Sequence, residues 1–310
     1  MALSLGVTFL ALEGAVRMWP ESATRYPLLE GRQYKGPFNS LGYRDTEHAR
    51  TPEPGTHRVL FVGDSFTFAG GVLLDDGYPK RVERRLQRFR KEPWESVVLA
   101  KPGLNTTDEL SILETEGLSL QPEVVVLGYV LNDAESPDWA EHRRAREWQE
   151  MAGLTPPWWS ASALFRMVGR RLRSAREARL RIRNYRELFA NGSAGFVESM
   201  RALARMAELA KSRRLPLIVA IFPLLGNPLD DTYPFFEETR KVAESARSAG
   251  AIPLDLFPHY RGLDWTHLVV NGADDEHPNE IGHRIAAQAV AEEIDRLLPR
   301  ASERNPKDTP

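Results

Sequence analysis

The sequence predicts an α/β fold built on a mostly parallel, five-stranded sheet with helices on both faces. Segments with apolar residues at helical spacing alternate with short runs that are apolar almost throughout, as strands buried on both faces are. This alternation is typical of a parallel sheet, whose active site lies at the carboxyl ends of the strands. The five runs are residues 58–63, 96–100, 123–130, 216–222 and 251–254.

The elements follow one another in a regular order along the chain. The first run (RVLFVG) ends in glycine, and Pro79 then occupies a plausible first helical position. Val82, Leu86 and Phe89 follow it at helical spacing. Further helices are expected at residues 106–118, 197–211 and 234–248, and a final one from residue 280 onward.

These elements predict one large domain over residues 58–300, after an irregular lead-in at residues 20–57 and before a disordered tail at residues 301–310. A helical insertion at about residues 134–196 is long for a single connection. Residues 165–188 within it hold nine arginines against two glutamates. We favour a helical cap with a solvated arginine face. The alternative is a basic lid that guides an anionic polymer or touches anionic lipid.

The N-terminal segment, residues 1–19, has two interpretations. Residues 2–12 are apolar, but the run is too short to span a bilayer, and Glu13 and Arg17 follow it. It is either a start helix packed on the domain or the end of a truncated membrane anchor. The second interpretation predicts an extracytoplasmic, membrane-associated protein, and the first a cytoplasmic one.

Composition excludes some functions. The chain has 310 residues, a formal charge of -2 and no cysteine. The near-neutral charge gives no overall attraction to nucleic acid or to anionic membrane. The missing cysteines exclude disulfides, thiolate metal sites and a cysteine nucleophile. We therefore expect no nucleic-acid partner. No cofactor is expected either, because the chemistry that the motifs below indicate needs none. The oligomeric state is not indicated.

A candidate nucleophile, Ser65, lies in the segment GDSFT at the end of the first strand. There its hydroxyl can protrude into the crevice, and a helix that begins at this point directs its amides at a developing oxyanion. Thr67 stands where the lipase-type elbow G-x-S-x-G has its second glycine, so that motif does not apply. Taken alone, the three residues GDS are as typical of an ordinary turn.

A candidate base and its orienting acid lie just before the final helix, in the segment DDEHPN. A serine hydroxyl needs a base within hydrogen-bond reach, and the base needs an acceptor that orients it. Asp274 and His277 can fill these roles from one tight loop. The acidic run is also compatible with a helix N-terminus or with a metal site, but one histidine beside three carboxylates is a weak zinc pattern, so no metal is expected.

Two further strand ends offer oxyanion donors. Gly103 follows the second strand in a loop whose backbone N–H can face a ligand. Asn132 ends the third strand, where its side-chain amide can donate to an oxyanion. Each also fits an ordinary turn. The four positions nevertheless occur in the order Ser, Gly, Asn, His at one edge of a parallel sheet, and this conjunction favours catalysis.

This arrangement resembles the SGNH (GDSL-type) hydrolase family, in its bacterial esterase and O-acetyl-modifying branch. The resemblance covers roughly residues 38–298, including the lead-in segment NSLGYRD. It implies a flavodoxin-like three-layer α/β/α sandwich. It also implies a catalytic triad of Ser65, His277 and Asp274, with an oxyanion hole formed by Ser65, Gly103 and Asn132. One position departs from the family pattern, because Val130 stands where its third block usually has glycine.

The expected activity is that of a serine esterase, in which Ser65 forms an acyl-enzyme with a small acyl group, most simply acetyl, on a small-molecule or glycan ester. The alternatives are an O-acyltransferase acting on a polysaccharide with the same residues and a non-catalytic carbohydrate-binding module. His283, on the final helix, is expected to pack or cap rather than to catalyse. Aromatic residues suggest either a substrate wall or core packing: Phe66, Phe68, Tyr129, Phe222, Trp158 and Trp159.

Overall fold

The computed structural model describes residues 2–18, 36–152, 162–270 and 275–298. Its sheet has five strands in the order β2-β1-β3-β4-β5, and every neighbouring pair is parallel. The predicted fold is therefore confirmed, with strand ends within about two residues of the apolar runs. The strands are β1 (His57–Gly63), β2 (Trp94–Ala100), β3 (Val124–Tyr129), β4 (Leu217–Ile221) and β5 (Ile252–Asp255).

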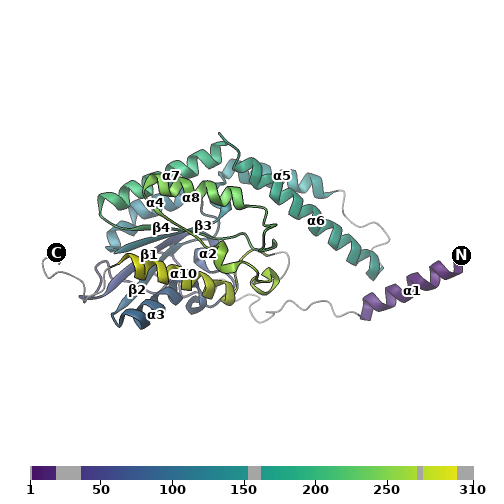
Figure 1. The fold of residues 1–310 in the computed structure, drawn as a ribbon, viewed down its shortest axis with the longest axis horizontal. Helices are drawn as coiled ribbons and strands as arrows, with labels where there is room; N and C mark the ends of the chain where they lie inside the picture. The colour runs from purple at the N-terminus through teal and green to yellow at the C-terminus, as the bar shows by residue number, and fades with distance from the viewer. Residues whose placement is uncertain (1, 19–35, 153–161, 271–274, 299–310) are drawn as a thin grey trace.

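Helices cover both faces of this sheet (Figure 1). On one face α3 (Tyr78–Arg90) packs against α10 (Glu280–Leu297). On the other face lie α4 (Thr106–Thr115), α7 (Ala194–Ser212) and α8 (Phe236–Ala249). This is a three-layer α/β/α sandwich. Shorter elements complete it: α2 (Ser65–Phe68), η2 (Leu74–Asp76), η3 (Gly117–Leu120), η4 (Leu131–Ala134), α9 (Phe257–Tyr260) and η6 (Trp265–His267).

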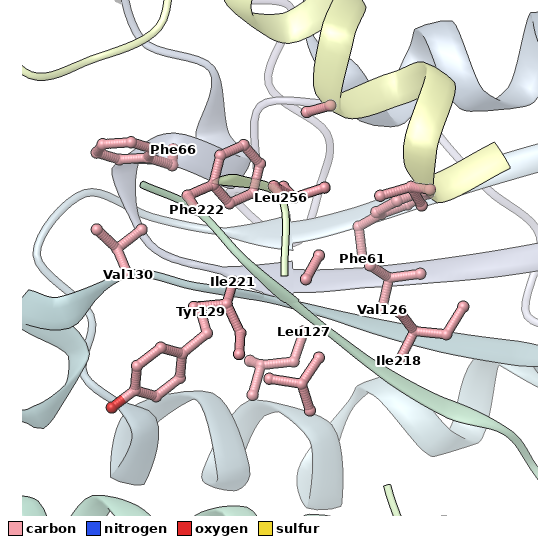
Figure 2. Close-up of a cluster of buried hydrophobic side chains, with 14 of the residues drawn as sticks. Phe61, Phe66, Val126, Leu127, Tyr129, Val130, Ile218, Ile221, Phe222 and Leu256 are labelled. Atoms are coloured by element: carbon pink, nitrogen blue, oxygen red, sulfur yellow. The ribbon is translucent and has the colours of Figure 1, made fainter. Parts of the chain in front are cut away.

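The core follows the central strands. In the register of the sheet Phe61 on β1 lies beside Val126 on β3, which in turn lies beside Ile218 on β4, and all three are buried. Figure 2 shows this cluster continuing to Tyr129 and Phe222 at the carboxyl ends of the strands. Burial on both faces explains why these strands are apolar at every position. It also fixes the loops that carry the site at one rigid edge.

The described part of the lead-in, residues 36–56, has no helix or strand, but it is firmly attached to the domain. The buried Arg44 side chain donates to the backbone carbonyls of Phe68, Ala69 and Val72. Its neighbour Asp45 forms a buried ion pair with Lys80 on α3. The lead-in therefore helps to hold the segment that follows α2.

Two helices occupy the described part of the insertion, α5 (Pro137–Ala152) and α6 (Ala163–Leu188). The N-terminal helix α1 (Ala2–Met18) packs against α6, away from the sheet in Figure 1. The Glu13 carboxylate accepts hydrogen bonds from the amides of Ala163 and Leu164 at the start of α6. None of the helices within the described ranges is long and apolar enough to cross a membrane. The predicted tail, residues 301–310, lies outside these ranges.

Candidate active site

Ser65 is the first residue of α2, directly beyond the carboxyl end of β1. Asp64 caps this short helix, and its carboxylate accepts a hydrogen bond from the Phe66 amide at 2.9 Å. The cap turns the chain sharply out of the sheet, so that Ser65 remains partly exposed while Asp64 and Phe66 are buried. The predicted nucleophile therefore stands at the crevice edge of the sheet.

Thr67 explains the glycines at the ends of two neighbouring strands. A Cβ atom on Gly63 would lie 2.1 Å from the Thr67 hydroxyl oxygen, and one on Gly128 would lie 2.2 Å from the same atom. Both glycines are therefore required by the close approach of Thr67, whose hydroxyl lies 3.0 Å from that of Tyr78. In the lipase-type elbow the residue two positions after the nucleophile is a glycine. Here that residue is Thr67, and the glycines that make room for it are on the strands, at Gly63 and Gly128.

The loop before α10 brings His277 to Ser65. Nε2 of His277 lies 3.0 Å from Oγ of Ser65, although the two residues are 212 positions apart. On the other side of the ring, Nδ1 lies 2.7 Å from a carboxylate oxygen of Asp275. The same oxygen accepts a hydrogen bond from the His277 backbone amide at 2.9 Å, which closes an Asx turn.

This hydrogen bond determines which ring nitrogen can act as base. A carboxylate only accepts hydrogen bonds, so Nδ1 of His277 carries the proton in the neutral ring and Nε2 presents its lone pair to Ser65. Burial lowers the pKa of His277, but the hydrogen bond and charge of Asp275 outweigh it, so that the pKa is raised above its ordinary value of 6.5. The arrangement is that of a base oriented and made more basic by a carboxylate.

Among the described residues, Asp275 supplies the carboxylate that contacts Nδ1 of His277. Asp274, which the spacing D-x-x-H and the family resemblance both indicated for the orienting role, lies outside the described residues, so that assignment stays a prediction. The sequence contained a local signal for Asp275, because an aspartate two residues before a histidine can close an Asx turn onto its amide.

Asn132 lies in η4, just past the end of β3, and its side-chain amide donates to a carboxylate oxygen of Asp64 at 2.9 Å. A primary amide has two N–H donors, and this bond uses one of them. The Ser65 hydroxyl lies 3.2 Å from the same oxygen of Asp64. The carboxylate of Asp64 therefore connects the nucleophile with the predicted side-chain donor, a connection that the sequence analysis did not identify.

Gly103 lies beyond the carboxyl end of β2, the strand next to β1, and has a φ of 81°. This left-handed conformation favours glycine and keeps the backbone open, since an added Cβ would meet no atom within 4 Å. Val130 shows how the departure from the family pattern is accommodated. It is extended and fully buried, and its amide donates to the carboxylate of Asp133 at 2.7 Å.

The insertion reaches the loop that carries His277. Arg181 on α6 forms an ion pair and hydrogen bond with Glu276, the residue directly before His277. Burial raises the pKa of Glu276, and the guanidinium of Arg181 opposes this shift. No local pattern in the sequence indicates this contact, because it joins side chains from two separate elements.

Several other candidates lie in the core. His283 is fully buried, its Nδ1 accepts a hydrogen bond from the Tyr78 amide at 3.3 Å, and burial lowers its pKa to about 3. The side chains of Phe66, Phe68, Tyr129 and Phe222 are buried as well, whereas residues 158 and 159 lie outside the described ranges. In the described part of the chain no three histidine or carboxylate side chains gather as metal ligands would.

Comparisons with solved structures returned chains of similar architecture at low identity. A lipase/acylhydrolase from Enterococcus faecalis is 18% identical, with a TM-score of 0.48 over 79% of this chain and 98% of that chain. A lipolytic protein of the G-D-S-L family from Desulfitobacterium hafniense, described as putative, is 15% identical, with a TM-score of 0.46 over 76% and 98%. The acetyl xylan esterase AlAXEase is 16% identical, with a TM-score of 0.48 over 78% and 100%.

A comparison with curated proteins found no match. A family model does match, over residues 61–285, which is most of the chain. This range begins in the strand before Ser65 and ends in the helix after His277, so it includes both residues that the structure brings together. The chain belongs to the GDSL-like lipase/acylhydrolase family and is an ester hydrolase.

Proposed function

We propose that this ester hydrolase acts through an acyl-enzyme on Ser65, and that its substrate is a small acyl ester, an acetyl group carried by a carbohydrate. The observation that carries the mechanism is the 3.0 Å contact between Nε2 of His277 and Oγ of Ser65. That distance permits direct proton transfer from the hydroxyl to the ring. The acetyl and carbohydrate parts rest on the resemblance to the O-acetyl-modifying branch of the family.

In the proposed reaction His277 removes the Ser65 proton while Oγ attacks the ester carbonyl. The negative charge on the carbonyl oxygen is received by the amides of Ser65 and Gly103 and by the free N–H of Asn132. His277 then protonates the departing alcohol, which leaves Ser65 acylated. Water, deprotonated by His277, attacks the acyl group, and the acid product and the free serine are regenerated.

Asp64 supports the side-chain donor in this scheme. Its carboxylate accepts from the Asn132 amide and lies within reach of the Ser65 hydroxyl. Burial raises the pKa of Asp64, while the bonds from Asn132 and from the Phe66 amide oppose this shift. A fixed acceptor holds the Asn132 side chain in one orientation, so its second N–H needs no reorganisation during the reaction.

The packing beside the base supports a small acyl group. The Phe66 ring lies 5.4 Å from the His277 ring, and its other neighbour is Phe222 at 5.6 Å, with both phenylalanines buried. Packed aromatic rings beside the base limit the room for an acyl chain on that side, which favours a short acyl group.

The test is the variant Ser65→Ala, assayed with p-nitrophenyl esters of increasing chain length and with acetylated xylo-oligosaccharides. We expect loss of hydrolysis with an unchanged unfolding midpoint, and wild-type activity that is highest on acetyl esters. Intact-protein mass after treatment with a serine-directed phosphonate should increase in the wild type and remain constant in the variant. Retained turnover by Ser65→Ala would refute the mechanism, whereas a preference for long acyl chains would refute only the substrate.

One observation favours the acyltransferase alternative: α6, in the insertion, contacts the loop that carries His277, which we call the catalytic loop. An acceptor sugar bound beside the insertion would lie near Glu276 and hence near the acyl-enzyme. Adding unmodified oligosaccharide to the same assay separates the two functions. Transfer of acetyl to the sugar at the expense of free acetate would establish a transferase, and an unchanged yield of acetate would exclude it.

A further inference from the structure

The long helix α6 carries one exposed face of unusual composition. Along it, exposed residues recur at steps of three or four positions, which places them on a single side of the helix. The first three are apolar and the next four are arginines: Phe165, Val168, Leu172, Arg176, Arg179, Arg183 and Arg186. We call this set the α6 face.

The apolar half of the α6 face is well exposed. Val168 is 43% exposed and Leu172 is 64% exposed, in a helix that begins far from the sheet in Figure 1. Helix α1 extends this apolar surface at the same end. It is held there by the Glu13 carboxylate at the start of α6 and by the contact of Phe9 with Phe165.

Helix α1 also presents apolar side chains of its own, with Val7 62% exposed and Leu10 68% exposed. The docking of α1 is specific, because one carboxylate, Glu13, accepts hydrogen bonds from the Ser162 hydroxyl and from the amides of Ala163 and Leu164. Two docked helices thus expose apolar residues at the same end of the molecule, where the sheet cannot cover them.

Most arginines in the basic half of the α6 face form no ion pair with a carboxylate in the described part of the chain. Arg183 pairs with Glu150 and Glu187, but within the described ranges no carboxylate forms an ion pair with Arg176, Arg179 or Arg186. The helix as a whole holds nine arginines and two glutamates, although the complete chain has a net charge of -2. Positive charge is therefore concentrated on this one element.

The α6 face points away from the catalytic centre. Arg181, which contacts the catalytic loop, is two positions from both Arg179 and Arg183 and so lies on the opposite side of the helix. The side of α6 that approaches the loop carrying His277 is therefore the side of Arg181, and the α6 face is turned away from it. The arginines consequently fit a partner other than the ester that is being cleaved.

We propose that α1 and the α6 face form a docking surface for an anionic phospholipid bilayer, with the apolar ends of both helices in the acyl boundary and the arginines at the headgroup phosphates. Apolar residues followed by guanidinium groups on one helical face match the two layers that a bilayer surface presents. An anionic soluble polymer would match the arginines and leave the apolar half without a partner. Docking in this way leaves the opposite side of α6, and the site beyond it, open to substrate.

The test measures sedimentation of the full chain with vesicles of phosphatidylcholine, with and without about one third phosphatidylglycerol. We expect binding to the anionic vesicles that weakens with salt. Each arginine at an anionic surface strengthens binding about fivefold. The triple variant Arg176→Glu/Arg179→Glu/Arg186→Glu should therefore bind at least about a hundredfold more weakly. The pair Val168→Asp/Leu172→Asp should also lose binding.

The matched control is Arg201→Glu/Arg247→Glu/Arg284→Glu, which makes the same charge change at exposed arginines on other helices. It should bind like the wild type, and all variants should hydrolyse a soluble p-nitrophenyl ester at the wild-type rate. Equal losses in both triple variants, undiminished binding by the Val168 and Leu172 pair, or equal binding to uncharged vesicles would each overturn the proposal. Self-association that the apolar pair abolishes, without vesicle binding, would assign the surface to a second copy of the chain.

Discussion

In the described part of the chain, the carboxylate of Asp275 fixes the orientation of the His277 ring. Asp275 makes two hydrogen bonds to His277, one to the ring and one to the backbone amide. In other triads, replacing the corresponding aspartate by asparagine reduces kcat about 10⁴-fold, because the ring adopts the wrong tautomer. We expect Asp275→Asn to reduce kcat on p-nitrophenyl acetate by about 10³ to 10⁴-fold.

Asp274→Asn is the matched control for this prediction, since it makes the same change one position earlier. It should retain activity to within a few fold. A larger loss in Asp274→Asn than in Asp275→Asn would return the orienting role to the residue that the family resemblance implied.

The raised pKa of His277 predicts the acid limb of the pH profile. The base must be neutral to accept the Ser65 proton, so kcat/KM should fall as the pH drops through a pKa above 6.5. Burial acts against this shift, and the hydrogen bond and charge of Asp275 cause it. Removing that charge in Asp275→Asn should move the acid limb to lower pH in the residual activity.

The variant Glu276→Gln should change the pKa of His277 less than Asp275→Asn does. The charge of Glu276 also raises this pKa, but it contributes less than Asp275. Its acid limb should move in the same direction by a smaller amount. Profiles of kcat/KM from pH 5 to 9 would measure both. An acid limb that stays in place in both variants would show that His277 is not the titrating base.

At the scale of elements, the strands were predictable and the contacts between distant elements were not. Strands β1 and β3 are apolar at nearly every position because both of their faces are buried, and that property is visible in the sequence alone. The alternation of strands and helices also predicted that Ser65 and His277 lie at one edge of the sheet, because the carboxyl ends of parallel strands meet there. The roles of Asp64 and Arg181 depend on side chains meeting across loops, which no local pattern encodes.

The ion pair between Arg181 and Glu276 predicts that α6 stabilises the catalytic loop. Both side chains are largely removed from water, with exposed fractions of 25% and 22%. Losing Arg181 leaves a carboxylate that burial already disfavours, so Arg181→Ala should lower the free energy of unfolding by about 1–3 kcal/mol. It should also reduce kcat, because the loop carries His277.

A double-mutant cycle measures this coupling. Urea unfolding of Arg181→Ala, Glu276→Ala and the double variant should give an interaction energy of about 1–2 kcal/mol. The exposed pair of Arg240 and Glu237 is the matched control, with exposed fractions of 52% and 69%, and its cycle should give less than about 1 kcal/mol. Additive effects in the Arg181 cycle would mean that α6 does not support the catalytic loop.

At the scale of the whole molecule, the site is assembled from segments that no single element could hold. Ser65 follows β1 and His277 precedes α10, and the structure brings these two residues into contact. Gly103 and Asn132, the proposed oxyanion donors, follow β2 and β3. Gly63 and Gly128 accept Thr67 between neighbouring strands, which sets the path of α2 relative to the sheet. The lead-in packs onto this assembly from outside the sheet. The sequence indicated an irregular segment there and, in NSLGYRD, a resemblance to the family, but not the contacts that the segment makes.

Arg44 is the residue through which the lead-in acts on the domain. Its guanidinium lies 2.7 Å from the carbonyl of Ala69 and 2.6 Å from that of Val72, with a third acceptor at Phe68. Ala69 has a φ of 57°, a left-handed conformation that is strained for alanine and needs support from its surroundings. The buried guanidinium of Arg44, with its planar fork of N–H donors, therefore holds the turn that directly follows α2, the helix that begins at Ser65.

Removing this fork leaves three carbonyls without their shared donor, so Arg44→Ala should lower the free energy of unfolding by about 3 kcal/mol or more. Arg44→Lys keeps the charge but replaces a planar fork by a single ammonium, and it should recover only part of the loss. The exposed Arg88→Ala is the control and should change stability by less than about 0.5 kcal/mol. Full recovery by lysine in urea unfolding would show that the charge alone matters, and the geometry of the fork would then not be what ties the lead-in to the turn after Ser65.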